Sequence, residues 1–107
     1  MHRLITRHIE QLVYRCPTHP SIDTLAEAIM AIRARAPLGR EQHTTGHMHP
    51  DDARALLTDA LERDSLLLRA DDTVWLLGAE LHTDTTITPG TFEIRAHLIK
   101  QERPCLP

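Results

Sequence analysis

The chain has 107 residues, of which 41% are hydrophobic and 25% charged, a composition typical of a globular domain rather than a disordered chain. Its length supports one hydrophobic core, so we expect a single domain over residues 1–107. The net charge of −3 argues against a general electrostatic attraction to nucleic acid, and any basic patch must therefore be local.

Residues 2–16 have the pattern of an amphipathic helix. Apolar residues recur at helical intervals and charged residues occupy the other side. The apolar positions are Ile5, Ile9, Leu12, Val13 and Cys16, and the charged ones are Arg3, Arg7, Glu10 and Arg15. Pro17 and Pro20 cannot continue a helix, so we expect this first helix to end at Cys16.

A second helix is predicted over residues 23–36. Ser21 or Asp23 can cap its start, and Pro37 prevents it from continuing. Its apolar stripe consists of Leu25, Ile29, Ile32 and Ala36.

A polar segment without periodicity, residues 38–49, separates this helix from a third one and is expected to be a mobile loop. The third helix begins at Pro50, which fits a first helical position, and Asp51 and Asp52 complement the positive end of the helix dipole. Its expected core-facing residues, with Leu57 at the centre, are Ala53, Leu56, Leu57, Ala60 and Leu61.

The remainder is expected to be β-structure. Residues 66–69 and 73–77 are short β-prone runs separated by an acidic turn, which predicts a hairpin. A second hairpin is predicted between residues 85–88 and a strand with strict alternation of apolar residues, although good helix formers at 93–103 leave a helix as the alternative. The alternating residues are Phe92, Ile94, Ala96 and Leu98. Residues 101–107 are expected to form a flexible tail.

Three helices followed by a tight hairpin form the layout of the winged helix-turn-helix domain. Residues 49–78, HPDDARALLTDALERDSLLLRADDTVWLLG, resemble the recognition helix and wing of bacterial IclR-type winged-helix regulators. In that pattern a helix with a paired-leucine centre precedes a Leu-Arg strand, an acidic turn and a strand that ends in Leu-Gly. The resemblance implies an α+β fold: a three-helix winged helix with a β-hairpin wing and a C-terminal β-hairpin or strand.

The same resemblance implies a DNA-binding transcriptional regulator that is not an enzyme. Arg54 and Thr58 would then face a groove of double-stranded DNA from the third helix, and Arg69 would contact phosphate from the wing. Arg40, in the preceding loop, is a further candidate for contact with nucleic acid.

The acidic residues favour an alternative function. Asp51 and Asp52 in the first turn of the third helix, and Asp71 and Asp72 at the wing tip, would repel phosphate. A winged-helix module that docks a protein partner through this helix or the wing, as an adaptor or inhibitor, is therefore the alternative. Its candidate contacts are Asp51, Asp52 and Trp75.

Neither catalysis nor a cofactor is expected. Three of the eight histidines, His43, His47 and His49, lie in the predicted loop, but their spacing matches no zinc motif, so we expect no metal site. Cys16 and Cys105 lie far apart without a partner motif, so we expect no disulfide.

No apolar run approaches the roughly 20 residues of a membrane span, and the N-terminus lacks the apolar region of a signal peptide. We therefore expect a cytoplasmic protein without membrane contact. An alternating C-terminal strand with an open edge could pair two chains into a homodimer.

Overall fold

The computed structural model describes residues 4–8, 11–35, 42–63, 67–70 and 73–98. These residues form two helices and one seven-stranded mixed sheet with the strand order β1-β2-β7-β3-β6-β5-β4. The elements are β1 Leu4–His8, β2 Gln11–Cys16, α1 Ile22–Arg35, β3 Gln42–Met48, α2 Pro50–Glu62, β4 Leu67–Ala70, β5 Thr73–Leu76, β6 Ala79–Thr83 and β7 Phe92–Leu98. The fold is α+β, but the predicted three-helix winged helix is wrong. The expected first helix, residues 2–16, and the expected loop, residues 38–49, contain strands of a large sheet.

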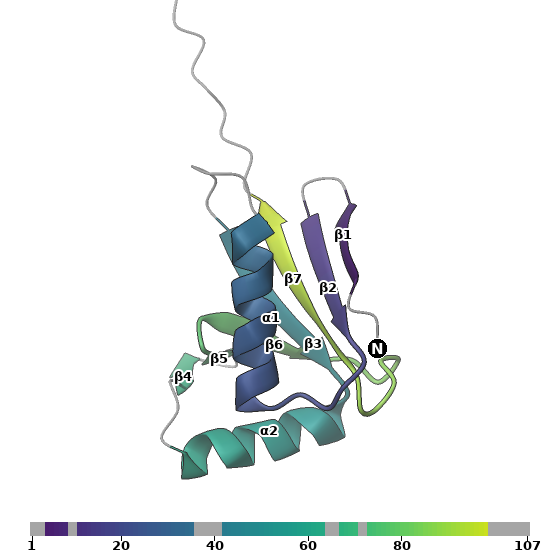
Figure 1. Ribbon diagram of the computed structural model, residues 1–107. Coiled ribbons are helices and arrows are strands. Elements are labelled where there is room, and N and C mark those ends of the chain that lie inside the picture. The colour runs from purple at the N-terminus through teal and green to yellow at the C-terminus, as the bar shows by residue number, and fades with distance from the viewer. Residues whose placement is uncertain (1–3, 9–10, 36–41, 64–66, 71–72, 99–107) are drawn as a thin grey trace, which may run out of the picture.

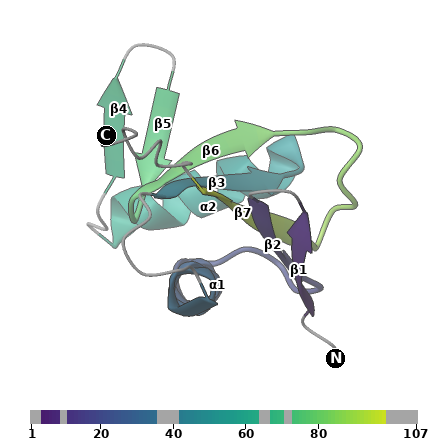
Figure 2. The ribbon, with the colours of Figure 1, turned by 90° about the horizontal axis from the view of Figure 1, so that it is seen from above.

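The two helices leave one face of the central sheet open. α1 packs against β2 and β7, and α2 crosses the lower end of the molecule against α1 and β6 (Figure 1). Seen from above, the described helices lie on one side of or beneath the central strands, and the opposite side carries neither of them (Figure 2). We call this side the uncovered face.

Residues 4–8 and 11–16, within the first predicted helix, form two antiparallel strands, so that prediction is wrong. β1 pairs with β2 from Leu4 opposite Arg15 to His8 opposite Gln11. In β2 the core residues alternate along the chain and belong to the main apolar cluster; they are Leu12, Tyr14 and Cys16. The apolar residues of this segment also fit the two-residue repeat of a strand. Pairing with β7 stabilises the strand rather than a helix.

α1 confirms the second predicted helix and its start. The Ser21 backbone N–H donates to Thr24 Oγ1 at 2.8 Å, and the Thr24 N–H donates to Ser21 Oγ at 3.2 Å, which is a reciprocal cap. Its buried residues are Leu25, Ala28, Ile29 and Ile32; Ala36 lies outside the described residues.

α2 confirms the third predicted helix and its start at Pro50, but its buried stripe is rotated from the prediction. Ala53, Leu56 and Ala60 are buried, whereas Leu57 is half-buried and Leu61 is 62% exposed. Leu56, not Leu57, is therefore the central core residue of this helix.

Most of the predicted mobile loop is strand β3, which runs antiparallel to β7 and parallel to β6. The neighbouring strands satisfy its backbone hydrogen bonds, so a strand forms although the sequence is polar. Gly46 faces the core, because a Cβ there would meet Leu81 Cδ2 at 3.1 Å and Ile94 Cδ1 at 3.4 Å. His43, Thr45 and His47 consequently face the other way.

The C-terminal half contains the predicted β4–β5 hairpin, but this hairpin extends the sheet through β6 instead of standing alone as a wing. β7 is the predicted alternating strand, and not a helix. It pairs with β2 and β3, whereas residues 85–88, its predicted partner, belong to the loop between β6 and β7. β6 itself was not predicted.

Candidate functional site

The uncovered face is largely polar, although Val13, which lies opposite Arg95 in the β2–β7 register, is also on it and is buried. In β7 the alternation buries Phe92, Ile94, Ala96 and Leu98 and leaves the intervening residues on the uncovered face. The strand register places polar and aromatic residues of five strands beside them. Together these residues are Arg15, His43, Thr45, His47, Trp75, Glu80, His82, Glu93, Arg95 and His97.

Four histidines on this face are connected through one carboxylate and one hydroxyl. Glu80 holds two of them, with His43 Nε2 at 3.0 Å from Oε2 and His82 Nε2 at 3.2 Å from Oε1. The buried Thr45 hydroxyl lies 2.7 Å from His47 Nε2 and 3.3 Å from a nitrogen of the fourth imidazole, Nε2 of His97. The rings of His47 and His82 stack with centroids 5.1 Å apart, which closes the chain of contacts.

Beside the histidines, two arginines share one carboxylate. Arg15 Nε donates to Glu93 Oε1 at 3.1 Å, and Arg95 donates to Glu93 Oε2 from Nε at 3.2 Å and Nη2 at 2.8 Å. Burial alone would raise the pKa of Glu93, but the hydrogen bonds and charges of Arg95 and Arg15 outweigh it and lower this pKa. Glu93 is therefore ionised at neutral pH, and the three charges sum to plus one.

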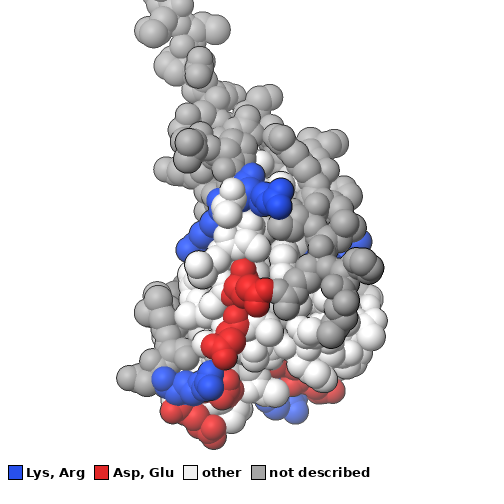
Figure 3. Space-filling view, in the orientation of Figure 1, with Lys and Arg blue, Asp and Glu red and all other residues white. Residues whose placement is uncertain are grey.

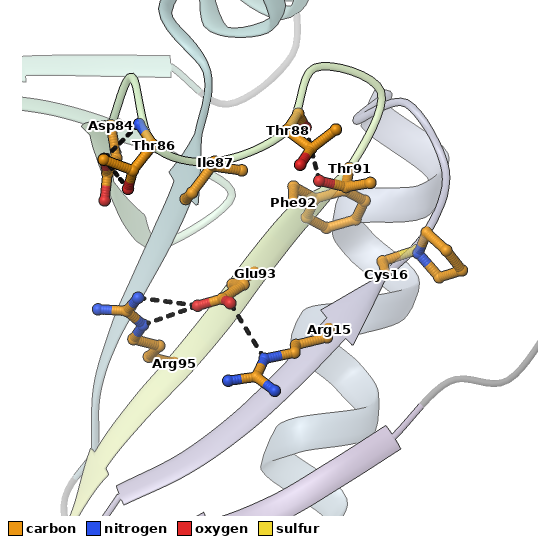
Figure 4. Close-up of a pocket in the computed structure, with 11 residues that line it drawn as sticks. Arg15, Cys16, Asp84, Thr86, Ile87, Thr88, Thr91, Phe92, Glu93 and Arg95 are labelled. Atoms are coloured by element: carbon orange, nitrogen blue, oxygen red, sulfur yellow. Dashed lines mark hydrogen bonds and ion pairs between the residues drawn. The ribbon is translucent and has the colours of Figure 1, made fainter.

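A pocket of about 650 Å³ opens next to these three side chains, on the uncovered face (Figure 4). Its apolar wall includes Pro17 and Ile87. Its complete lining is Arg15, Cys16, Pro17, Asp84, Thr86, Ile87, Thr88, Thr91, Phe92, Glu93 and Arg95.

The β6–β7 loop, which lines the pocket with Asp84, Thr86, Ile87, Thr88 and Thr91, is held by hydrogen bonds at several points. The Asp84 N–H donates to Met48 O at 2.9 Å, and the Gly90 N–H donates to Asp52 Oδ2 at 2.8 Å. Asp84 accepts from the side chain and backbone of Thr86 at 2.6 and 2.9 Å, and these bonds lower its pKa. These hydrogen bonds give the loop a defined shape.

Two histidines of the uncovered face are held in the neutral form. Burial, followed by the charge of Arg95, lowers the pKa of His47 from 6.5 to about 4. Burial, followed by the charges of His43 and Arg95, lowers the pKa of His97. His47 is adjacent to the pocket, since it lies opposite Glu93 in the β3–β7 register.

Within the described ranges, no group of three His, Cys, Asp or Glu side chains is placed to hold a metal ion. None of the helices in that part of the chain is long and apolar enough to cross a membrane.

The residues predicted to contact DNA do not line the pocket. Arg54 and Thr58 are exposed on α2, where the Thr58 hydroxyl donates to Arg54 O at 3.0 Å, and Arg69 is exposed on β4 near the edge of the sheet. Arg40 lies outside the described residues. On the helical side, acidic and basic side chains are interspersed rather than gathered into a basic patch (Figure 3). Contact of these residues with DNA stays a prediction, without the winged-helix setting on which it rested.

The residues predicted to contact a protein partner have separate places in the fold. Asp51 is exposed, Asp52 binds the pocket loop, and Trp75 packs edge-on against His43 with ring centroids 5.6 Å apart. Contact with a partner stays a prediction for all three.

Sequence reasoning missed Arg15, His47, Glu93 and Arg95 as one site. The alternation in β7 already separated Glu93 and Arg95 from the apolar residues, and this signal could have marked a polar sheet face. The strand identity of β2 and β3 was the missing information. Comparison with protein-family models, curated proteins and solved structures finds no match for this chain.

Proposed function

We propose that the protein is a binding domain for a small organic anion, which occupies the pocket on the uncovered face. The observation that carries this proposal is a pair of arginines that share a single carboxylate at the edge of a pocket with an apolar wall. A pocket with few convergent polar groups and neighbouring residues of shifted pKa is the usual form of a ligand site.

The arginines supply the attraction for the anion. Each guanidinium has five N–H donors in a planar fork that matches carboxylate and phosphate. Within the described residues, the bonds to Glu93 use Nε of Arg15 and Nε and Nη2 of Arg95, which leaves both terminal nitrogens of Arg15 to donate elsewhere. The Arg15 side chain is 61% exposed, so it can turn toward a ligand at small cost.

The apolar wall supplies the affinity for an organic body. Ile87 and Pro17 line the same pocket as the Glu93 carboxylate (Figure 4). Burial of apolar ligand surface here would contribute about 25 cal/mol per Å² before the costs of ordering the ligand. A free inorganic anion would lack this contribution and should bind more weakly.

Titration calorimetry with naphthalene-1-sulfonate tests the proposal. The wild-type protein should bind this probe, whereas 1-naphthol, which lacks the anionic group, and inorganic sulfate, which lacks the apolar body, should bind much more weakly. Naphthalene-1-carboxylate and 1-naphthyl phosphate, compared in parallel, would show which anionic group is preferred.

The Arg15→Gln variant should raise the dissociation constant for naphthalene-1-sulfonate about tenfold, because it removes charge-assisted hydrogen bonds to the anion. Arg54→Gln is the matched control, since Arg54 is an exposed arginine on α2 outside the pocket lining, and its affinity should equal that of wild type. Equal weakening by both variants would indicate nonspecific charge attraction and refute a pocket site.

A further inference from the structure

His47 is the histidine closest to the charged edge of the pocket. In the sheet it lies between Glu93 on β7 and His82 on β6, which are its register partners on the two sides. Its Nε2 is fixed at 2.7 Å from the Thr45 hydroxyl, and its ring stacks on that of His82 at 12° between the planes. Its position is therefore defined by contacts on β3, β6 and β7.

Charged groups surround His47 from every neighbouring element. β7 contributes Glu93, Arg95 and His97, and the charge of Arg95 disfavours a proton on His47 whereas Glu93 favours it. β6 contributes His82, with Glu80 beyond it, and the β6–β7 loop contributes Asp84. On β3 itself, His43 lies four residues before His47 and contacts Glu80 and His97, and β2 contributes Arg15, which reaches Glu93.

Burial, followed by the charge of Arg95, lowers the pKa of His47 to about 4, so His47 is uncharged near neutral pH. An anion bound by Arg15 and Arg95 would add negative charge on this side of the sheet. Because opposite charge nearby favours the charged form of a titratable group, such an anion counteracts the charge of Arg95 at His47 and raises the pKa of this imidazole.

We propose that binding of the anion draws a proton onto the His47 imidazole, so that affinity for the anion rises as the pH falls below neutrality. The proposal rests on the proposed function and names the regulation of the same site. His47 is a positioning residue here: once protonated it pairs with Glu93 opposite it, and Arg95 is released to donate to the ligand. Linkage requires that a ligand which raises proton uptake binds more tightly where protons are more abundant.

The test measures the dissociation constant of naphthalene-1-sulfonate at pH 7.5 and pH 5.5 at constant ionic strength. This probe stays anionic throughout that range, and Glu93 and Asp84 stay ionised because the pKa of each is lowered. The wild-type affinity should increase about three- to tenfold at the lower pH, the upper value corresponding to return of His47 to its ordinary titration range in the complex.

His47→Gln should bind the probe with little dependence on pH, whereas His43→Gln, a control on the same face but outside the pocket lining, should keep the wild-type dependence. NMR titration of the His47 imidazole should show its pKa rising when the probe is present. A flat wild-type profile, or an unchanged profile in His47→Gln, would overturn the inference while Arg15-dependent binding still upheld the pocket. Absence of probe binding at both pH values would instead refute the proposed function, and the inference with it.

Discussion

Single residues on the uncovered face have charges that their neighbours set. Glu93 remains ionised although it is partly buried, because two arginines donate to it, and His47 remains neutral because burial and Arg95 oppose its proton. Glu93 in turn keeps Arg15 and Arg95 within reach of one another despite their like charges. The two arginines are therefore arranged around one carboxylate.

Leu56 is the side chain that defines the core-facing side of α2. Leu56→Ala should destabilise the fold by about 2–5 kcal/mol, because Leu56 is 2% exposed and its loss leaves a cavity between the helices and the sheet. Leu61→Ala is the control in the same helix and should change stability by less than about 0.5 kcal/mol, since Leu61 is 62% exposed.

Chemical denaturation monitored by circular dichroism gives both values. Comparable losses of stability in the two variants would mean that α2 is rotated relative to the orientation described above.

Among the secondary-structure elements, α1 and α2 were predicted because their capping residues and their buried apolar stripes indicate the same helices. Pro50 and the residues after it mark the start of α2, and a serine cap marks that of α1. The sequence could not show that Leu56, and not Leu57, is the central core residue of α2, because both leucines fit an apolar helix face.

The strands that build the site were missed because their stability depends on distant partners. β3 contains three polar residues that face away from the core, and its backbone is satisfied by β6 and β7, which lie more than thirty residues later in the chain. The apolar pattern of β2 fits both a helix and a strand, and its pairing with β7 stabilises the strand. With these strands undetermined, the sequence could not bring Arg15, His47 and Arg95 together.

The serine cap of α1 makes a prediction at this scale. Ser21→Ala should lower the free energy of unfolding by about 1 kcal/mol, because it removes the hydroxyl that accepts the Thr24 N–H. Thr58→Ala, an exposed hydroxyl within α2, is the control and should have an effect below about 0.5 kcal/mol. Thermal or urea unfolding measures both, and an equal effect of the two substitutions would argue against the cap.

For the whole molecule, the arrangement of layers explains where function can reside. Helices on one side supply the apolar core with Leu25, Ile32 and Leu56, so the central strands need not be covered on their other side. The uncovered face therefore carries polar residues from five strands and the loop that lines the pocket (Figure 2, Figure 4). β2 and β7 form the floor of the pocket. The edge strand β1 is next to β2, whereas the other edge strand, β4, lies far from the pocket in strand order.

The most direct test of the central claim is backbone NMR mapping of naphthalene-1-sulfonate on the uniformly labelled protein. Saturable shifts of the backbone amide resonances should concentrate at Arg15, Thr86, Glu93 and Arg95, with smaller shifts at His47. The amide resonances of outer residues of α2, such as Arg54 and Leu61, should stay unchanged. Saturable shifts centred on α2 or spread evenly over the surface would contradict the account, because the anion would then bind elsewhere than on the uncovered face.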